Sequence, residues 1–192
     1  PTICDLVQKF DDDKKTELLD SLIKPKIDAI KEIKNGRDGL VLMLEQLFEM
    51  FQPIQLLDAN FHEYIFDIIK NERAVQYKIR AAKILGSKVV APLIKGKKYR
   101  ALLTDFTDEL RTSKNFRHRQ IYLYVAMSAY EVDNEVFKKH FAKNIGNDME
   151  NEPCKCVKIV MAKLCNTVTK DYSKSLEKVR TKLLADGDET VL

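Results

Sequence analysis

Three cysteines near the C-terminal end are the residues whose type and spacing come closest to a metal site. Cys154 and Cys156 form a Cys-x-Cys motif, and Cys165 follows them. Residues two apart on a helix point in different directions, and zinc sites usually combine two closely spaced ligand pairs. No histidine lies nearby in the sequence, so we expect buried free thiols, no metal and no cofactor. With Cys4 as the only other cysteine, there is no disulfide framework, which favours a reducing, intracellular compartment.

The histidines and glycines give no sign of catalysis. His62, His118 and His140 are isolated, and none belongs to a recognisable nucleophile motif with serine or cysteine. Gly86 and Gly96 stand alone, whereas a phosphate-binding loop needs clustered glycines. We predict that the chain is not an enzyme.

Basic residues are the remaining candidates for chemistry. Lys97, Lys98 and Arg100 surround Tyr99, and a second cluster comprises Arg111, Lys114, Arg117 and Arg119. Basic residues with an interleaved aromatic can bind a nucleic acid backbone. A base-stacking site usually needs aromatic platforms, however, and the chain has no tryptophan. Solvated helix starts are therefore the favoured interpretation, with nucleic-acid binding as the alternative.

The charge is unevenly distributed along the chain. Residues 1–70 hold 9 Lys/Arg and 14 Asp/Glu, a net charge of −5, and residues 71–192 hold 24 and 15, a net charge of +9. Such a distribution suggests oriented binding of an acidic partner by the C-terminal two-thirds. Helical arrays carry dense surface charge in any case, and we favour that explanation of the uneven charge.

The apolar spacing predicts helices almost throughout a chain that is 45% hydrophobic with only six glycines and five prolines. Asp11–Asp13 should cap a helix that Pro25 ends or kinks, Pro53 should close a helix over 37–52, and the apolar residues of 57–68 should form one face of a single helix. Gly86–Gly96 should be a loose connection, and Gly146–Pro153 a polar loop. No apolar run is long enough to cross a membrane, and residues 1–10 do not resemble a signal peptide. We expect a cytoplasmic protein, with the nucleus as the alternative.

A repeat organises these helices. Arg80, Arg119 and Lys158 are separated by 39 residues each, with similar apolar flanks. A period near 40 made of two helices predicts an all-α, right-handed α-α superhelix, a HEAT/armadillo-like solenoid of about four to five helical pairs. We expect one domain over 1–192, with irregular helices in 1–36, repeats over 37–70 with 71–96, 97–131 and 132–168, and a last helix over 170–185. The alternative is an ordinary helical bundle with coincidental spacing.

The register predicts burial. Ile79, Val157 and Ala162 should lie in seams between helices, and Leu123 should lie in the middle of the array with neighbours on both sides.

Several of these segments resemble a known family. Asp148, Val157-Lys158 and Ala162-Lys163-Leu164 are similar to the repeat consensus of the scaffold subunits of type 2A serine/threonine phosphatases, in which an Asp precedes a Val-Arg pair and Ala-Lys-x-Leu. Lys114–Arg119 resembles the start of their second helices, and Glu135–Phe137 through Phe141 resembles the start of their first helices. The resemblance covers about residues 97–165, in a chain much shorter than those scaffolds.

The resemblance implies a HEAT-repeat scaffold or adaptor that binds protein partners, with a phosphatase catalytic or regulatory subunit as a candidate. It implies a structural ladder of charged residues between repeats at Arg80, Arg119 and Lys158. Partners would contact turns within helical pairs and the ridge of second helices. The candidate turns are Asn35–Arg37, Asn71–Arg73, Thr112–Asn115 and Gly146–Pro153. The candidate partner-binding residues are Arg73, Lys97, Lys98, Arg100, Lys114, Arg117, Arg119 and Lys155.

Overall fold

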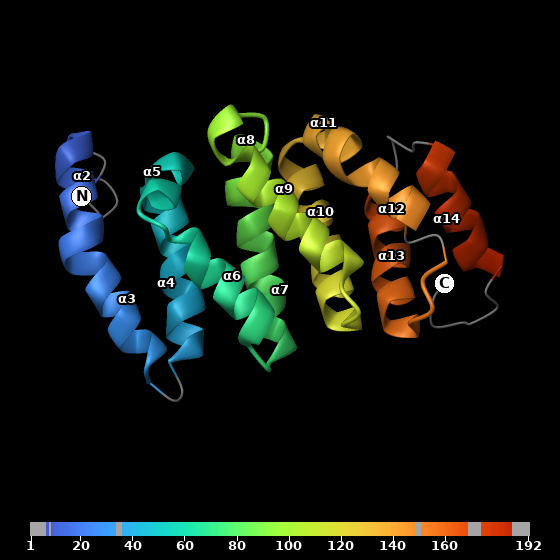
Figure 1. The fold of residues 1–192 in the computed structure, drawn as a ribbon, viewed down its shortest axis with the longest axis horizontal. Helices are drawn as coiled ribbons and strands as arrows, with labels where there is room; N and C mark the ends of the chain where they lie inside the picture. Colours follow the sequence, from blue (N-terminus) through green and yellow to red (C-terminus); the bar gives the residue numbers. More distant parts are fainter. Residues whose placement is uncertain (1–6, 8, 34–35, 149–150, 169–173, 186–192) are drawn as a thin grey trace. The chain divides into compact units, whose positions relative to one another are not determined.

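A computed structural model describes residues 7, 9–33, 36–148, 151–168 and 174–185 of the chain (Figure 1). All regular secondary structure in these ranges is helical, as predicted. The chain divides into two compact units, Pro1–Ile84 and Leu85–Leu192. Within the described ranges, no helix has the length and apolar content needed to cross a membrane. The predicted features at Cys4, Asn35 and Tyr172, and the side chain of Asp148, lie outside what the structure describes.

The first unit begins with one nearly continuous helical run. It consists of α2 (Asp12–Leu18), the π-helical turn η1 (Leu19–Ile23) and α3 (Lys24–Lys31). The Asp11 carboxylate caps α2 by accepting a hydrogen bond from the Lys14 backbone N–H at 2.8 Å, as predicted from the acidic run. Pro25 does not end the helix, because the π-helical turn before it accommodates the missing N–H.

The rest of the first unit packs against this run. It comprises α4 (Arg37–Met50), α5 (Pro53–Asp58), α6 (His62–Asn71) and α7 (Val75–Ile84), and α4 packs on both α3 and α7. Pro53 starts α5 rather than merely closing α4, since its fixed φ suits the first turn of a helix. Lys78 is 4% exposed, and its ammonium caps the end of α6 by donating to the carbonyls of Ile69 at 2.5 Å and Lys70 at 3.0 Å.

The single helix predicted over 57–68 is wrong. The chain breaks at Asn60, which adopts a left-handed φ of 62°. The Phe61 N–H donates to the Leu56 carbonyl at 2.8 Å and the Asn60 N–H to the Leu57 carbonyl at 3.0 Å. This pair of bonds is a Schellman motif, and asparagine is the commonest substitute for glycine at its left-handed position. The apolar spacing continued across the break because Leu56, Leu57 and Phe61 are all buried on either side of it.

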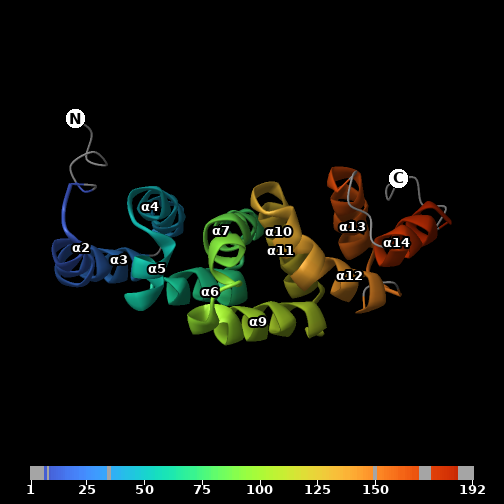
Figure 2. The same cartoon turned by 90° about the horizontal axis from the view of Figure 1, so that it is seen from above.

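The second unit has two layers of helices (Figure 2). α10 (Phe116–Val132) and α13 (Lys155–Thr167) lie side by side in one layer, and α9 (Lys97–Thr112), α11 (Asn134–Phe137) and α12 (Lys143–Asp148) lie in the other. Asn115 caps α10 and Asp133 caps α11. The remaining elements are η2 (Leu85–Val90), α8 (Ala91–Leu93), η3 (Lys138–Ala142) and α14 (Lys174–Ala185).

The loose connection predicted over Gly86–Gly96 is also wrong, because η2 and α8 occupy most of it. Gly86 is not a helix breaker here but a point of close approach to α10. A Cβ atom at Gly86 would lie 2.4 Å from the Val125 carbonyl oxygen and 2.9 Å from the Ser128 Cβ. Glycine therefore permits η2 and α10 to pack with almost no space between their backbones.

Burial along α10 fits a helix that has neighbours on several sides. α10 contacts η2, α9, α11 and α13, and Leu123 is fully buried, as predicted. Val157 is also fully buried, whereas Ile79 and Ala162 are only half-buried, so the prediction is wrong for those two. α13 packs on α10 and α14. On α7, Lys78 rather than its neighbour Ile79 is the buried residue, and its ammonium caps the end of α6.

The polar loop predicted over Gly146–Pro153 is shorter than expected. α12 extends to Asp148, and Gly146 is buried within it. The described end of the loop, Asn151–Pro153, includes Glu152, which is 7% exposed. A buried carboxylate in a loop needs a partner, and that partner defines the site described next.

Candidate protein-binding surface

The starts of α10 and α13 lie next to each other and are built alike. The N–H groups of His118 and Arg119 both donate to the Asn115 carbonyl, at 3.0 and 3.4 Å. In α13, the N–H groups of Val157 and Lys158 both donate to the Cys154 carbonyl at 3.0 Å. Arg119 and Lys158, which are 39 residues apart, thus occupy the same place in the first turn of each helix.

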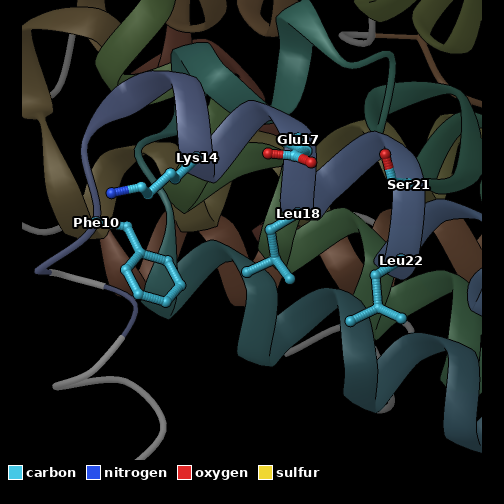
Figure 3. Close-up of a pocket in the computed structure, with 6 residues that line it drawn as sticks. All are labelled: Phe10, Lys14, Glu17, Leu18, Ser21 and Leu22. Carbon is cyan, nitrogen blue, oxygen red and sulfur yellow. The ribbon is translucent and has the colours of Figure 1, made fainter.

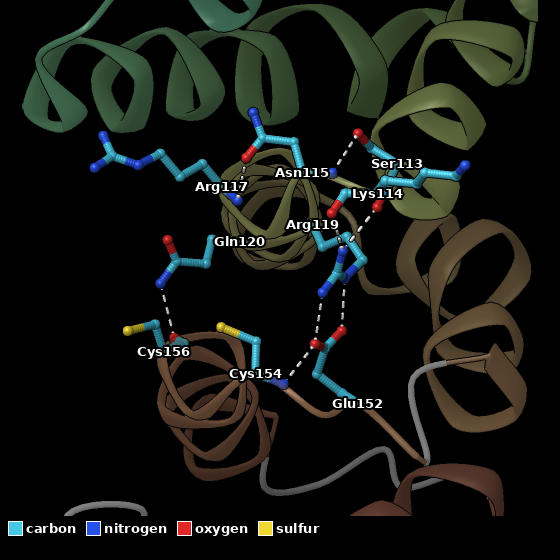
Figure 4. A network of polar contacts seen from close by, with 9 residues as sticks. All are labelled: Ser113, Lys114, Asn115, Arg117, Arg119, Gln120, Glu152, Cys154 and Cys156. Carbon is cyan, nitrogen blue, oxygen red and sulfur yellow. Dashed lines mark hydrogen bonds and ion pairs between the residues drawn. The ribbon is translucent and has the colours of Figure 1, made fainter.

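Arg119 joins the two starts through a bidentate ion pair (Figure 4). Its Nε and Nη2 donate to the two carboxylate oxygens of Glu152 at 2.7 Å each. Its Nη1 donates to the backbone carbonyls of Ser113 at 2.7 Å and Lys114 at 3.1 Å. These bonds connect the end of α9, the start of α10 and the loop before α13. Because the two side chains are only 16% and 4% exposed, the pair is well shielded from solvent and acts structurally.

Glu152 is held ionised by its surroundings. Burial raises the pKa of its carboxyl, but the hydrogen bonds from Arg119 and from the Cys154 N–H outweigh burial, and the pKa lies below its usual value. Sequence analysis missed Glu152. Glu152 lies just before the start of α13, 33 residues after Arg119. Only the repeat register could have indicated that these two residues come together, and that signal is weak.

A surface depression of about 650 Å³ lies beside this ion pair. Lys114 is exposed at its rim, while Arg111 is mostly covered and bonded to Asp108 at 3.1 Å. The depression is lined by Arg111, Thr112, Lys114, Arg119, Asn151, Glu152 and Pro153. The structure thus places two of the predicted contact turns, 112–115 and the described part of 146–153, around one hollow.

A second surface follows α10 and α13 on the side away from Glu152. Arg117, Gln120 and Cys156 lie together on that side (Figure 4). Gln120 links the helices by donating from Nε2 to the Cys156 carbonyl at 2.7 Å. We call six exposed or half-buried residues the α10–α13 ridge: Arg117, Gln120 and Tyr124 on α10, and Cys156, Ile159 and Lys163 on α13. Each of the three residues on α10 has its counterpart on α13 one 39-residue period later.

The ridge combines positive charge with apolar surface. The sequence of α13 contains no Asp or Glu, and in α10 the first acidic residue is Glu131. Ile159 is 39% exposed on the ridge, and Phe116, 37% exposed at the start of α10, has the Arg117 guanidinium over its ring at 5.8 Å. Cations and an exposed apolar residue on two helices whose facing segments, residues 116–130 and 155–167, contain no Asp or Glu fit a partner segment that carries both carboxylates and an apolar side chain.

The other predicted partner-binding residues lie elsewhere. Lys97, Lys98 and Arg100 are exposed at the start of α9. Arg100 donates to the carbonyls of Ile94 at 3.2 Å and Lys95 at 2.5 Å, and the Lys98 ammonium lies 5.2 Å from the centre of the Tyr99 ring. Two of the three cations are therefore engaged locally.

Arg73, Lys155, Lys158 and Arg80 differ in their surroundings. Arg73 is exposed after α6 in the first unit, and Lys155 is exposed at the start of α13, beside the ridge. Lys158 is half-buried one turn into α13. Arg80 on α7 donates to the Glu45 carboxylate on α4 at 3.0 and 2.5 Å, so that its guanidinium joins two helices of the first unit.

The cysteines differ in burial, and His118 makes a structural contact. Cys165 is buried, and burial raises the pKa of its thiol to about 11, but Cys154 is half-buried and Cys156 exposed, so the prediction of buried thiols is wrong for these two. The ridge position of Cys156 explains its exposure. The His118 Nδ1 lies 3.2 Å from the Ser113 hydroxyl, which also accepts a bond from the Asn115 N–H, and this contact closes the turn before α10.

Among the residues that the structure describes, no group of His, Cys, Asp and Glu is arranged to hold a metal ion. A scan against protein-family models found no match to this chain, and searches of the curated proteins and of the solved structures found none either.

Proposed function

We propose that the chain is a short array of HEAT-type helical pairs and that it acts as a protein-binding scaffold rather than an enzyme. The observation that carries the proposal is the α10–α13 ridge, a surface on which two neighbouring helices of one layer present equivalent positions 39 residues apart. Extended ridges of this kind are how stacked helical pairs present binding surfaces.

The pattern of burial supports a repeat with a period of 39 residues. Five residues at or near α10 and their counterparts 39 residues later, at or near α13, are all buried. The pairs are Ile121 and Val160, Tyr122 and Met161, Val125 and Leu164, Ala126 and Cys165, and Ala129 and Val168. Ser128 is buried in α10 whereas its counterpart Thr167 in α13 is only half-buried, and Ser128 lies against Gly86 of η2. This is the behaviour expected of an inner pair and a more peripheral pair of one array.

The link to type 2A phosphatases rests on the sequence resemblance over about residues 97–165. Arg119 and Lys158, the two basic residues of the repeat in this range, lie at the same position in the first turns of α10 and α13. This supports the HEAT register. The partner proposed from the resemblance is a phosphatase catalytic or regulatory subunit.

Affinity purification with a ridge variant tests the proposal. The parent chain and the double variant Arg117→Glu/Lys163→Glu are purified from the native cells with their bound proteins. A matched control, Lys139→Glu/Lys178→Glu, makes the same charge change at exposed positions of η3 and α14, two elements that contribute no residue to the ridge. We expect the ridge variant to lose partners that the control retains, because reversed charges in an interface repel.

Equal recovery of partners by all three chains would reject the ridge as the binding surface. Recovery of abundant partners without any phosphatase subunit would reject the phosphatase link and leave the scaffold proposal standing.

Nucleic-acid binding is the second candidate function. The positive charge at the start of α9 and along α13 favours it, since lysine and arginine release counterions from phosphates. It predicts an affinity for duplex or single-stranded DNA that falls steeply with salt and weakens in Lys97→Glu/Lys98→Glu/Arg100→Glu. No measurable binding at low salt would reject it.

A further inference from the structure

The α10–α13 ridge carries its two cations at opposite corners. α10 and α13 begin next to each other and lie side by side in one layer, so they run in the same direction (Figure 2). Arg117 lies at the start of the α10 row and Lys163 at the end of the α13 row. Ile159, which is 39% exposed, lies in the middle of the α13 row, at the level of Gln120. The ridge therefore has a cation at each end of a diagonal and an apolar side chain between them.

The length of this diagonal follows from helix geometry. From Arg117 to Tyr124, the counterpart of Lys163, a helix rises about 10 Å. Packed helices lie about 9 Å apart, so the diagonal from Arg117 to Lys163 is about 14 Å long between Cα atoms. An extended chain rises about 3.3 Å per residue, and its residues i and i+4 therefore span about 13 Å. The two lengths match.

We propose that the ridge binds an extended acidic segment with carboxylates at positions i and i+4 and a large apolar residue at i+2. Successive side chains of an extended chain point to opposite faces, so these three side chains point to the same face. The two carboxylates pair with Arg117 and Lys163, and the apolar side chain packs on Ile159. This inference rests on the proposed function, since it names the partner chemistry for the same ridge.

The charge of the two helices selects carboxylates. α10 and α13 have no Asp or Glu over residues 116–130 and 155–167, and a basic segment would meet like charges from Arg117 and Lys163. A nucleic acid fits the ridge less well. A strand of B-form DNA carries one phosphate per about 3.4 Å, so about four phosphates would face the two ridge cations. The exposed apolar surface of Ile159 would add nothing to phosphate binding.

A depression of about 300 Å³ on α2 and η1 differs from the ridge in this respect. Phe10, Leu18 and Leu22 line it in one row (Figure 3). The exposed Lys14 beside them lies 3.4 Å from the Asp11 carboxylate, so its charge is paired within the same turn of the chain. Charge at that depression therefore selects no partner chemistry, whereas the two ridge helices contribute cations only.

Fluorescence anisotropy with labelled peptides tests the proposal. The probe is Ser-Glu-Ser-Leu-Ser-Glu-Ser, and its matched control, Ser-Glu-Glu-Leu-Ser-Ser-Ser, has the same composition with adjacent carboxylates. We expect the chain to bind the probe about tenfold more tightly than the control, because the control cannot reach both ridge cations with its leucine on Ile159. A probe with serine in place of leucine should bind several-fold more weakly, since it buries no large apolar side chain.

Exchange of charge between chain and peptide gives an independent readout. Arg117→Glu and Lys163→Glu should each weaken binding of the probe about tenfold. The double variant Arg117→Glu/Lys163→Glu should instead bind Ser-Lys-Ser-Leu-Ser-Lys-Ser, which the parent chain should not bind. Lys139→Glu/Lys178→Glu is the control and should bind the acidic probe as the parent does, and circular dichroism checks that each variant keeps its helices.

Equal affinity for the probe and its permuted control would overturn the inference, as would no binding of the probe at about 1 mM chain. Tighter binding of a single-stranded DNA oligonucleotide, lost in Arg117→Glu/Lys163→Glu, would also overturn it and assign the ridge to nucleic acid. The proposed function is judged separately by recovery of partners from cells. If the ridge variant loses partners there while the probe fails to bind, the scaffold stands and its partner has a different chemistry.

Discussion

Gly86 offers the sharpest test of the packing, because the structure assigns opposite outcomes to the same substitution at two glycines. At Gly86 an added Cβ would lie 2.4 Å from the Val125 carbonyl oxygen and 3.1 Å from the Ala129 backbone nitrogen, in addition to the Ser128 contact. These are backbone atoms on α10, so η2 and α10 must move apart to admit a methyl group. At Gly39 on α4, the nearest atom would be the Ile30 Cγ2 at 4.0 Å, an ordinary contact.

The magnitudes follow from overpacking and helix propensity. Overpacking a close contact costs up to about 3 kcal/mol, and replacing glycine by alanine in a helix returns about 1 kcal/mol. We therefore expect Gly86→Ala to lower the free energy of unfolding by about 2 kcal/mol, and Gly39→Ala to raise it by about 1 kcal/mol. Urea unfolding followed by circular dichroism measures both. If Gly86→Ala were as stable as the parent, η2 would not pack against α10 as described.

Three further perturbations follow from the packing. Leu123→Ala should cost roughly 2–5 kcal/mol and Leu183→Ala less, because Leu123 is fully buried in α10 whereas Leu183 is 7% exposed in the last helix; urea unfolding showing the reverse order would refute the register. Arg119→Met should cost about 3–5 kcal/mol by leaving the Glu152 carboxylate buried without its partner, and thermal unfolding in which this variant matches the parent would refute a structural role. Burial lowers the pKa of His140, and the positive charges of Lys139, Arg100 and Lys95 lower it further. The neutral imidazole is therefore favoured in the folded chain, and the free energy of unfolding should fall as the pH drops below about 6.5. Urea unfolding should show a smaller fall between pH 7.5 and 5.5 in His140→Gln.

The helices could be predicted where apolar spacing and capping residues agree. Asn115 and Asp133 each precede an amphipathic stretch, and α10 and α11 begin directly after them. The errors arose where tertiary contacts override local signals. Glycine at position 86 indicated the end of a helix. In the structure, its missing side chain instead allows η2 and α10 to pack closely, and no local sequence pattern predicts that contact. Asn60 ends a helix inside an unbroken apolar spacing, because asparagine tolerates the left-handed conformation that the Schellman motif requires.

The candidate site could be predicted only in part. The 39-residue spacing pointed to Arg119 and Lys158 as equivalent positions, and both lie in the first turn of their helices. The partner of Arg119 could not be predicted, since Glu152 lies in a segment whose polarity suggested exposure. Long-range ion pairs depend on how loops fold back on helices, and the spacing of charges along the sequence does not specify that.

Alkylation of Cys156 tests the central claim most directly, because this exposed thiol lies on the α10–α13 ridge. The chain is treated with N-ethylmaleimide, free and in the complexes isolated from its native cells, and the adduct at each cysteine is quantified by mass spectrometry. Buried Cys165, whose thiol pKa is raised to about 11, should stay unmodified in both samples and serves as the internal control. A scaffold that binds its partner along the ridge predicts that Cys156 reacts in the free chain and is protected in the complex. Equal modification of Cys156 in the two samples would contradict the proposed binding surface.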